Sequence, residues 1–279
     1  MYVIQPHYHG IARTCDDYER MAHAGVVAVC EPAFWAGFDR RHVGTFIDYF
    51  RQISEFEPTR AAQYGIRHFC WVAQNPKESE NLSLSREVIA AIPDFLNKST
   101  VIGIGEIGLN KNTANELAIF REQLELAMKH GQLVLIHTPH LGDKLKGTRL
   151  TLDLLREMKF PPERCWIDHA EEHTIRAILD GGYWAGLTLY PMTKMSPRRA
   201  VDILERFGNG RIMVNSSADW GPSSPFTLFD CIFEFRRRGH SDQEAIEIFH
   251  NTPARFLGQN PKFDIQPILV VPRLTETRS

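Results

Sequence analysis

Short apolar runs rich in Val and Ile recur along this chain, and each is followed by a longer amphipathic segment. This alternation is typical of strands and helices that build a parallel sheet. A helix over Glu116–Lys129 that stops at Gly131 is one example of the intervening segments. Eight strands are predicted: Tyr2–Gln5, Gly25–Cys30, Ile66–Val72, Val101–Ile104, Leu133–Ile136, Cys165–Ile167, Gly182–Leu187 and Arg211–Val214. Eight such units predict an α/β fold of the TIM type, a closed (β/α)8 barrel with outer helices, and a doubly wound open sheet is the alternative.

The length of 279 residues and the hydrophobic content of 43% are those of one barrel-sized soluble domain. We expect the barrel to occupy residues 1–260. Beyond it, Pro261, Pro267 and Pro272 interrupt the apolar run Ile268–Val271, which disfavours regular structure. Residues 261–279 are therefore predicted to form an extended C-terminal tail packed on the barrel.

The formal net charge of -2 gives no broad attraction to nucleic acid or to anionic lipid, so a small molecule is the favoured ligand and nucleic acid is a weaker alternative. No apolar stretch is long enough to cross a bilayer, and the N-terminus lacks a secretory pattern. The odd number of cysteines favours reduced, mostly buried thiols and a cytoplasmic protein. They are Cys15, Cys30, Cys70, Cys165 and Cys231. The sequence leaves the oligomeric state open.

Potential metal ligands follow several of the predicted strands. His7 and His9 come directly after the first strand, and alternation in an extended chain points both imidazoles to the same side. With 12 histidines in the chain, one such pair is weak evidence by itself. Other predicted strands are followed by Glu106, His137, His169 and Asp219. A parallel barrel brings the carboxyl ends of its strands to one rim, so these six side chains are predicted to converge there.

Four imidazoles and two carboxylates suit a borderline divalent cation better than Ca²⁺, which prefers oxygen ligands. We expect Zn²⁺, with Mn²⁺ or Mg²⁺ as alternatives. Six ligands exceed the needs of one tetrahedral ion with an open position. The set therefore predicts one or two ions, and the dinuclear arrangement would use every ligand with Glu106 as the bridge.

The segment Ile102–Leu109 resembles the Gly-Glu-(Ile/Cys)-Gly-Leu-Asp signature of the TatD-related metal-dependent hydrolases, a family of the amidohydrolase-like barrel superfamily. The early His-x-His pair, Ile136-His137 and the late Asp219 support the resemblance, which covers most of residues 1–258. It implies that His7, His9 and Asp219 hold one ion, that His137 and His169 hold the other, and that Glu106 bridges them. The stretch Asn215–Gly221 resembles a divergent branch of the family linked to secondary-metabolite gene clusters.

Three positions depart from the family pattern. Asn110 stands where the signature has Asp, Asn215 begins a segment that is usually Glu-Thr-Asp, and Gln5 replaces an Asp. These changes surround the predicted ligands and leave nuclease activity as an open question. A phosphotriesterase- or lactonase-like hydrolase is a rival, although that branch usually bridges its metals with a carbamylated lysine and Lys111 comes too late for that role.

The predicted reaction is hydrolysis of a phosphoester or related ester by a hydroxide formed at the metal site, with Glu106 and Asp219 as catalytic residues and Asp219 as proton acceptor. A turn or helix cap is the structural alternative for Asp219. Asp168 precedes His169, and strand alternation predicts that it points the other way. Candidate substrate-binding residues are His140, His173, Lys146, Arg149 and Trp220. The non-enzymatic alternative is a metal-containing scaffold or binding protein.

Overall fold

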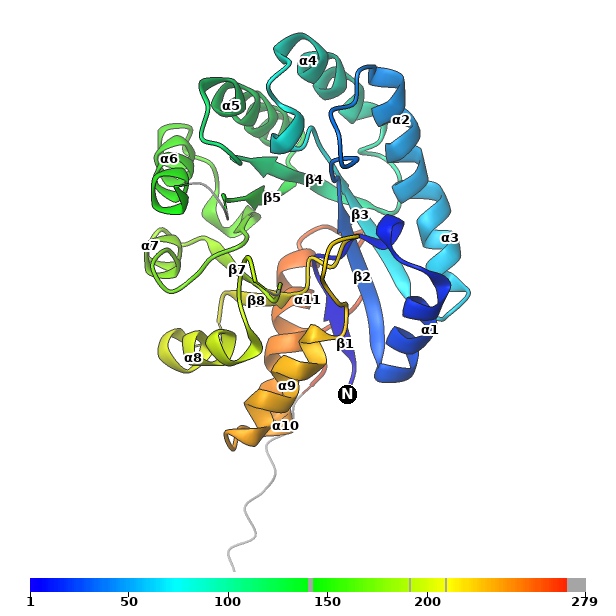
Figure 1. Cartoon of the computed structure of the whole chain (residues 1–279), viewed down its shortest axis with the longest axis vertical. Helices are drawn as coiled ribbons and strands as arrows, with labels where there is room; N and C mark the ends of the chain where they lie inside the picture. The colour runs from blue at the N-terminus through cyan, green and yellow to red at the C-terminus, as the bar shows by residue number, and fades with distance from the viewer. Residues whose placement is uncertain (140–142, 191, 209, 270–279) are drawn as a thin grey trace, which may run out of the picture.

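In the computed structural model, eight parallel strands form one sheet in which each strand pairs with the next along the chain. The structure describes residues 1–139, 143–190, 192–208 and 210–269. The strands are β1 (Val3–Gln5), β2 (Val26–Pro32), β3 (Arg67–Val72), β4 (Val101–Gly108), β5 (Leu133–His137), β6 (Cys165–Ile167), β7 (Trp184–Thr188) and β8 (Ile212–Asn215). Helices surround the strands on the outside (Figure 1). The prediction of a (β/α)8 barrel is confirmed.

The barrel closes just beyond the ends of β8 and β1. Ser217 donates its backbone N–H to the carbonyl of His7 (2.9 Å), and His9 donates to the carbonyl of Ala218 (3.0 Å). A parallel bridge joins Tyr8 to Ala218. The Gln5 side chain adds to this junction, because it accepts from the Ser216 N–H and donates to the carbonyl of Pro225.

The helices of the outer layer follow the strands in order. They are α1 (Cys15–Ala24), α2 (Val43–Arg51), α3 (Glu57–Ala62), α4 (Leu82–Ala91), α5 (Ala114–Lys129), α6 (Lys144–Glu157), α7 (Ile175–Asp180), α8 (Pro197–Phe207), α9 (Thr227–Arg237), α10 (Asp242–Ile246) and α11 (Thr252–Leu257). Side chains cap several of them, as Thr113 does for α5 and Ser196 for α8. No helix within the described ranges is both long and apolar enough to cross a membrane.

Alternation along the strands separates two apolar layers. In β5, Val134 and Ile136 pack outward under the helices, whereas Leu133 and Leu135 belong to the cluster inside the barrel. Phe256 of α11 belongs to the same inner cluster and lies against three strand tryptophans, Trp71, Trp166 and Trp184, with ring centroids 5.3–6.4 Å apart. Aromatic side chains therefore fill the barrel interior, and the rim at the carboxyl ends of the strands remains for a functional site.

The predicted strands differ from the observed ones by only a few residues at their ends. The main correction concerns β4, which was expected to end at Ile104 and instead continues through Glu106 to Gly108. The described start of the tail packs on the barrel: Phe263 is buried against Phe69, and Asn251 hydrogen bonds to Ile268. All five cysteines are free, and four are buried.

We predict that Phe256→Ala lowers the free energy of unfolding by about 3–5 kcal/mol, because it removes a fully buried ring from the barrel interior. The measurement is chemical denaturation followed by tryptophan fluorescence and by circular dichroism. Phe233→Ala on α9 is the matched control, since Phe233 is 67% exposed and its loss should change stability by less than about 0.5 kcal/mol. Equal effects of the two substitutions would contradict this account of the core.

Candidate metal centre

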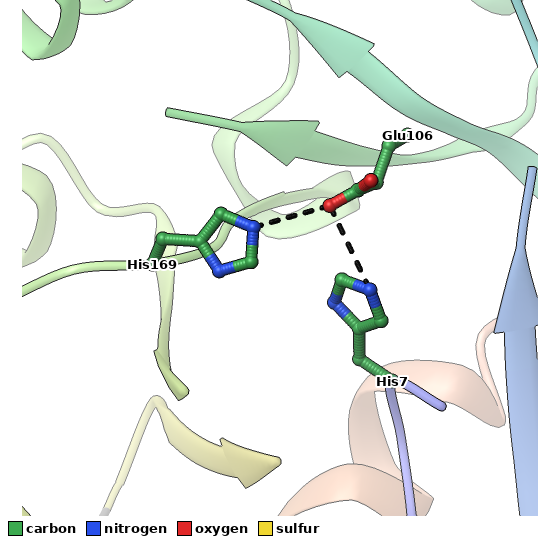
Figure 2. Close-up of side chains that lie close together, drawn as sticks. All are labelled: His7, Glu106 and His169. Carbon is green, nitrogen blue, oxygen red and sulfur yellow. Dashed lines mark hydrogen bonds and ion pairs between the residues drawn. The ribbon is translucent and has the colours of Figure 1, made fainter. Parts of the chain in front are cut away.

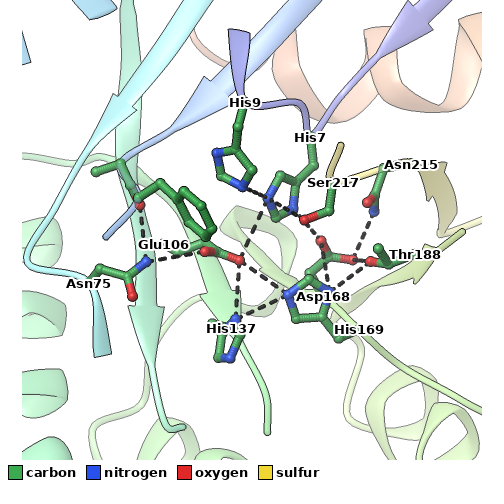
Figure 3. Close-up of polar contacts among 12 residues, drawn as sticks. His7, His9, Asn75, Glu106, His137, Asp168, His169, Thr188, Asn215 and Ser217 are labelled. Carbon is green, nitrogen blue, oxygen red and sulfur yellow. Dashed lines mark hydrogen bonds and ion pairs between the residues drawn. The ribbon is translucent and has the colours of Figure 1, made fainter. Parts of the chain in front are cut away.

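His7 and His9 lie in the extended segment that follows β1, and both imidazoles point into the barrel rim (Figure 3). Their Nε2 atoms are 3.1 Å apart, and both side chains are fully buried. Phe34 stacks on the His9 ring with centroids 4.0 Å apart. The prediction that alternation turns both rings to one side agrees with this geometry.

Glu106 enters the rim from a bulge in β4. Gly105 pairs with Leu135 and Ile107 pairs with Ile136, so Glu106 is an extra residue without a partner on β5. A bulge redirects the side chain that it contains. Glu106 Oε1 lies 3.6 Å from His7 Nε2 and 3.2 Å from His169 Nε2 (Figure 2). The other carboxylate oxygen accepts from the Asn75 amide at 3.2 Å, which fixes the orientation of the group.

His137 and His169 complete the cluster from the neighbouring strands. His137 is the last residue of β5, and His169 lies two residues beyond β6. The Nδ1 atom of His137 is 3.0 Å from His169 Nε2 and 3.2 Å from Glu106 Oε1. The structure thus brings together five of the six predicted ligands, all of them at most 4% exposed.

The side chain of Asp168 also faces the cluster, contrary to the prediction from alternation. His169 has a φ of 61°, so the chain is no longer extended there and neighbouring side chains need not point in opposite directions. Asp168 Oδ2 contacts His7 Nδ1 at 2.6 Å. Its Oδ1 accepts from Asn215 (2.9 Å) and Thr188 (3.2 Å), so this buried carboxylate holds its surroundings in place (Figure 3).

Asp168 determines which nitrogen of each facing histidine carries hydrogen. An ionised carboxylate only accepts, so the hydrogen in its contact with His7 belongs to His7 Nδ1. Thr188 donates its one hydroxyl hydrogen to Asp168, so it must accept from His169 Nδ1, which lies 2.7 Å away. In the neutral rings, the Nε2 atoms of both histidines therefore carry lone pairs.

Three electron-pair donors consequently face one another: His7 Nε2, His169 Nε2 and a Glu106 oxygen, all within 4.8 Å. A divalent cation would relieve the repulsion among these lone pairs and would use each as a ligand. The donors therefore fit a metal centre. His9 and His137 present further nitrogens at its edge.

Burial sets the charge states at the centre. It lowers the pKa of His9, His137 and His169 below the usual histidine value, so the rings stay neutral and able to bind metal at pH 7. Burial opposes ionisation of Glu106, but His137 and His7 outweigh it, and the pKa of this carboxyl is held well below its ordinary value. For Asp168 likewise, His169 and His7 overcome burial and lower the pKa.

Asp219 is half-buried and lies on the wall of a cavity of about 290 Å³ that Glu106, His137 and His169 also line. Its Oδ1 accepts from the Tyr190 hydroxyl at 2.9 Å and from the Gly221 N–H at 2.7 Å. Ser217, also after β8, contacts a predicted ligand through its side chain, because its Oγ is 3.3 Å from His7 Nε2. The role of Asp219 as a ligand remains a prediction.

The predicted substrate-binding residues are scattered. His140 falls outside the described residues. His173 is exposed in the turn before α7, and Lys146 and Arg149 are exposed on α6. Trp220 is 49% exposed and lines a groove of about 1380 Å³ beside the metal centre, where it packs against Phe34. Among the described candidates, Trp220 is thus the one that lines a groove next to the site.

Sequence reasoning missed Asn75, Thr188 and Ser217 at the centre, whereas Asn215 was named only as a departure from the family pattern. The three missed residues lie at or just after the carboxyl end of a strand. That position was the available signal, because every strand end of a parallel barrel faces the same rim. Only imidazole and carboxylate side chains were chosen as ligands there, because hydroxyl and amide groups are weaker metal ligands.

Residues 12–227 match the family model described as TatD related DNase. The chain belongs to this family. The match begins after His7 and His9 and includes Glu106, His137 and His169. The family prediction from sequence is confirmed, and membership identifies the chain as a hydrolase of the TatD family.

Comparisons with individual proteins agree with the family match and with the fold. An uncharacterised metal-dependent hydrolase of Methanocaldococcus jannaschii is 28% identical over 223 residues, which are 78% of this chain and 84% of that protein. The crystal structure of a TatD-like protein from Archaeoglobus fulgidus superposes with a TM-score of 0.73 at 27% identity and covers 91% of this chain and 99% of that one. A phosphotriesterase homology protein from Escherichia coli shares the fold, with a TM-score of 0.66, 16% identity and coverage of 92% and 98%.

We predict that Asp168→Asn weakens Zn²⁺ binding by roughly 10–100-fold, because the amide no longer fixes the hydrogen on His7 Nδ1. The dissociation constant is measured by competition with a chromophoric chelator. Thr188→Val, which keeps the side-chain shape, should weaken binding through His169. The control is Asp153→Asn on the exposed surface of α6. Unchanged affinity in both rim variants, with native thermal melting, would refute the assigned hydrogen positions.

Proposed function

We propose that the chain is a metal-dependent hydrolase that cleaves a phosphoester or related ester bond of a small molecule. The observation that supports this most directly is the convergence of His7 Nε2, His169 Nε2 and a Glu106 oxygen beneath a cavity open to substrate. The family membership agrees with it. Neither the cluster nor the family membership identifies the bond that is cleaved, so the ester bond is part of the proposal.

His7, His9, Glu106, His137 and His169 would hold one or two cations, with Asp219 as the predicted sixth ligand. The many imidazole donors favour Zn²⁺ or Mn²⁺ over a cation that requires oxygen ligands. When bound, such a cation acidifies water and polarises a substrate oxygen. The protein keeps the ligands neutral or ionised as needed through burial and through the hydrogen bonds of Asp168.

Asp219 would accept the proton that water loses. Both hydrogen bonds from Tyr190 and Gly221 go to Oδ1, and within the described ranges no donor engages Oδ2. Gly221 allows this arrangement, since a Cβ at that position would collide with the Tyr190 hydroxyl. Tyr190 therefore orients the carboxylate, and the second oxygen without a donor supports a role in general base catalysis.

We predict that the purified protein loaded with Zn²⁺ or Mn²⁺ hydrolyses at least one of p-nitrophenyl phosphate, bis-p-nitrophenyl phosphate, p-nitrophenyl acetate and a γ-lactone, and that chelation abolishes the activity. Glu106→Gln should reduce kcat by at least about 100-fold, because it removes the central charged ligand. A single-stranded DNA oligonucleotide belongs in the panel as a test of nuclease activity. Bound metal without turnover of any substrate would favour the scaffold alternative.

We predict that Asp219→Asn lowers kcat by roughly 10²–10⁴-fold, the usual contribution of a general base, while leaving most of the bound metal in place. Metal content by elemental analysis and rates on the best panel substrate are measured together. Asp264→Asn is the matched control, since Asp264 is an exposed carboxylate paired with Arg67. A wild-type rate in Asp219→Asn would remove Asp219 from the mechanism.

A further inference from the structure

Two lysines line the metal cavity, and neither was singled out by its position in the sequence. Lys77 follows β3, and Lys194 follows β7. They share the cavity of about 290 Å³ with Glu106, His137, His169 and Asp219. Both side chains are partly buried, so they remain accessible to a ligand in this cavity.

Aromatic rings hold both ammonium groups. Lys77 Nζ lies 4.6 Å from the centre of the Trp35 ring and 5.6 Å from that of Phe34. Lys194 Nζ lies 4.3 Å from the centre of the Tyr190 ring. Such cation–π contacts position a cation without neutralising it.

Carboxylates do not pair with these two lysines in the described part of the chain. Its ion pairs include neither Lys77 nor Lys194, and its hydrogen bonds include neither Nζ atom. Lys144, by contrast, donates its Nζ to the carbonyl of His169 at 2.7 Å and is already engaged. Six side-chain hydrogen positions therefore remain available on the pair of ammonium groups.

The charges in the cavity favour an anion once metal is present. Without a cation, the three carboxylates of Glu106, Asp168 and Asp219 exceed the ammonium charges of Lys77 and Lys194 by one. A divalent cation adds two positive charges, which this one excess carboxylate does not offset. Burial lowers the pKa of both lysines, whereas Glu106 and Asp219 raise it, and Lys77 further lowers the pKa of Lys194. An anion near the two ammonium groups would stabilise their charged forms.

We propose that Lys77 and Lys194 form a subsite that binds an anionic group of the substrate, a phosphoryl or a carboxylate oxygen, above the metal ligands. The substrate is then an anionic ester, which narrows the proposed function on which this inference rests. Lys77 also borders the larger groove of about 1380 Å³ with Phe34, Trp35 and Trp220, so the rest of a substrate held by its anion has an aromatic surface to lie against.

Isothermal titration of the metal-loaded protein, dialysed free of unbound metal, tests the subsite with inorganic phosphate and separately with acetate. The wild type should bind at least one of the two anions, and the preferred anion identifies the recognised group. Lys77→Gln and Lys194→Gln should each weaken binding by roughly tenfold, the usual effect of losing a charge-assisted hydrogen bond, and Lys194→Arg should retain most of it.

Lys129→Gln is the matched control, because Lys129 is exposed in the last turn of α5 and its loss should leave the affinity unchanged. Metal content and thermal melting are measured on every variant, so that loss of metal or of folding is recognised. Absence of binding by both anions, or equal affinity in the wild type and in both lysine variants, would overturn the proposal.

Kinetics separate this proposal from the proposed function. With p-nitrophenyl phosphate, the two Gln variants should raise KM about tenfold or more, whereas with neutral p-nitrophenyl acetate KM should change less than about twofold. Equal effects on the charged and the neutral ester would overturn the subsite. Lysine-dependent anion binding without any turnover would refute the hydrolase and leave the subsite standing.

Discussion

The hydrogen bonds of one buried carboxylate organise the metal centre. Asp168 fixes the hydrogen of His7 directly and that of His169 through Thr188, so both rings offer lone pairs toward Glu106. The carboxylate needs space inside the barrel, and β7 provides it at Gly186, where a Cβ would collide with Asp168 and Trp166. Two predicted ligands that follow different strands, His7 after β1 and His169 after β6, are thus linked through a residue that lies behind them.

Much of the fold followed from the sequence because the apolar pattern of a parallel barrel is strong. β6 was predicted with its observed bounds, and the other strands differ only at their ends. The predicted ligands His7, His9, Glu106, His137 and His169 were chosen by one geometric rule, that strand carboxyl ends share a rim, and the structure brings them together there. That rule needs only the order of the residues and no knowledge of the loops.

Other features depended on backbone geometry that a sequence pattern does not carry. The bulge at Glu106 extended β4 beyond its expected end, and the positive φ of His169 turned Asp168 inward. Lys77 and Lys194 reach the cavity from the connections after β3 and β7, and the conformation of such connections has no periodic signal. Lys146 and Arg149 were chosen for their charge and for their place after the fifth strand, and both are exposed on α6, which shows that charge near a strand end is a poor guide to where a side chain points.

The junction between β8 and β1 contains residues that both close the barrel and belong to the candidate metal centre. The backbone amides that close the barrel, those of His9 and Ser217, belong to residues whose side chains contact His7 at the candidate metal centre. A cation bound by His7 and His9 would therefore also stabilise the closing segment, and loosening of the first strand would separate the predicted ligands. The segment that follows the first strand would thus contribute both to the closure of the barrel and to the binding of a cation.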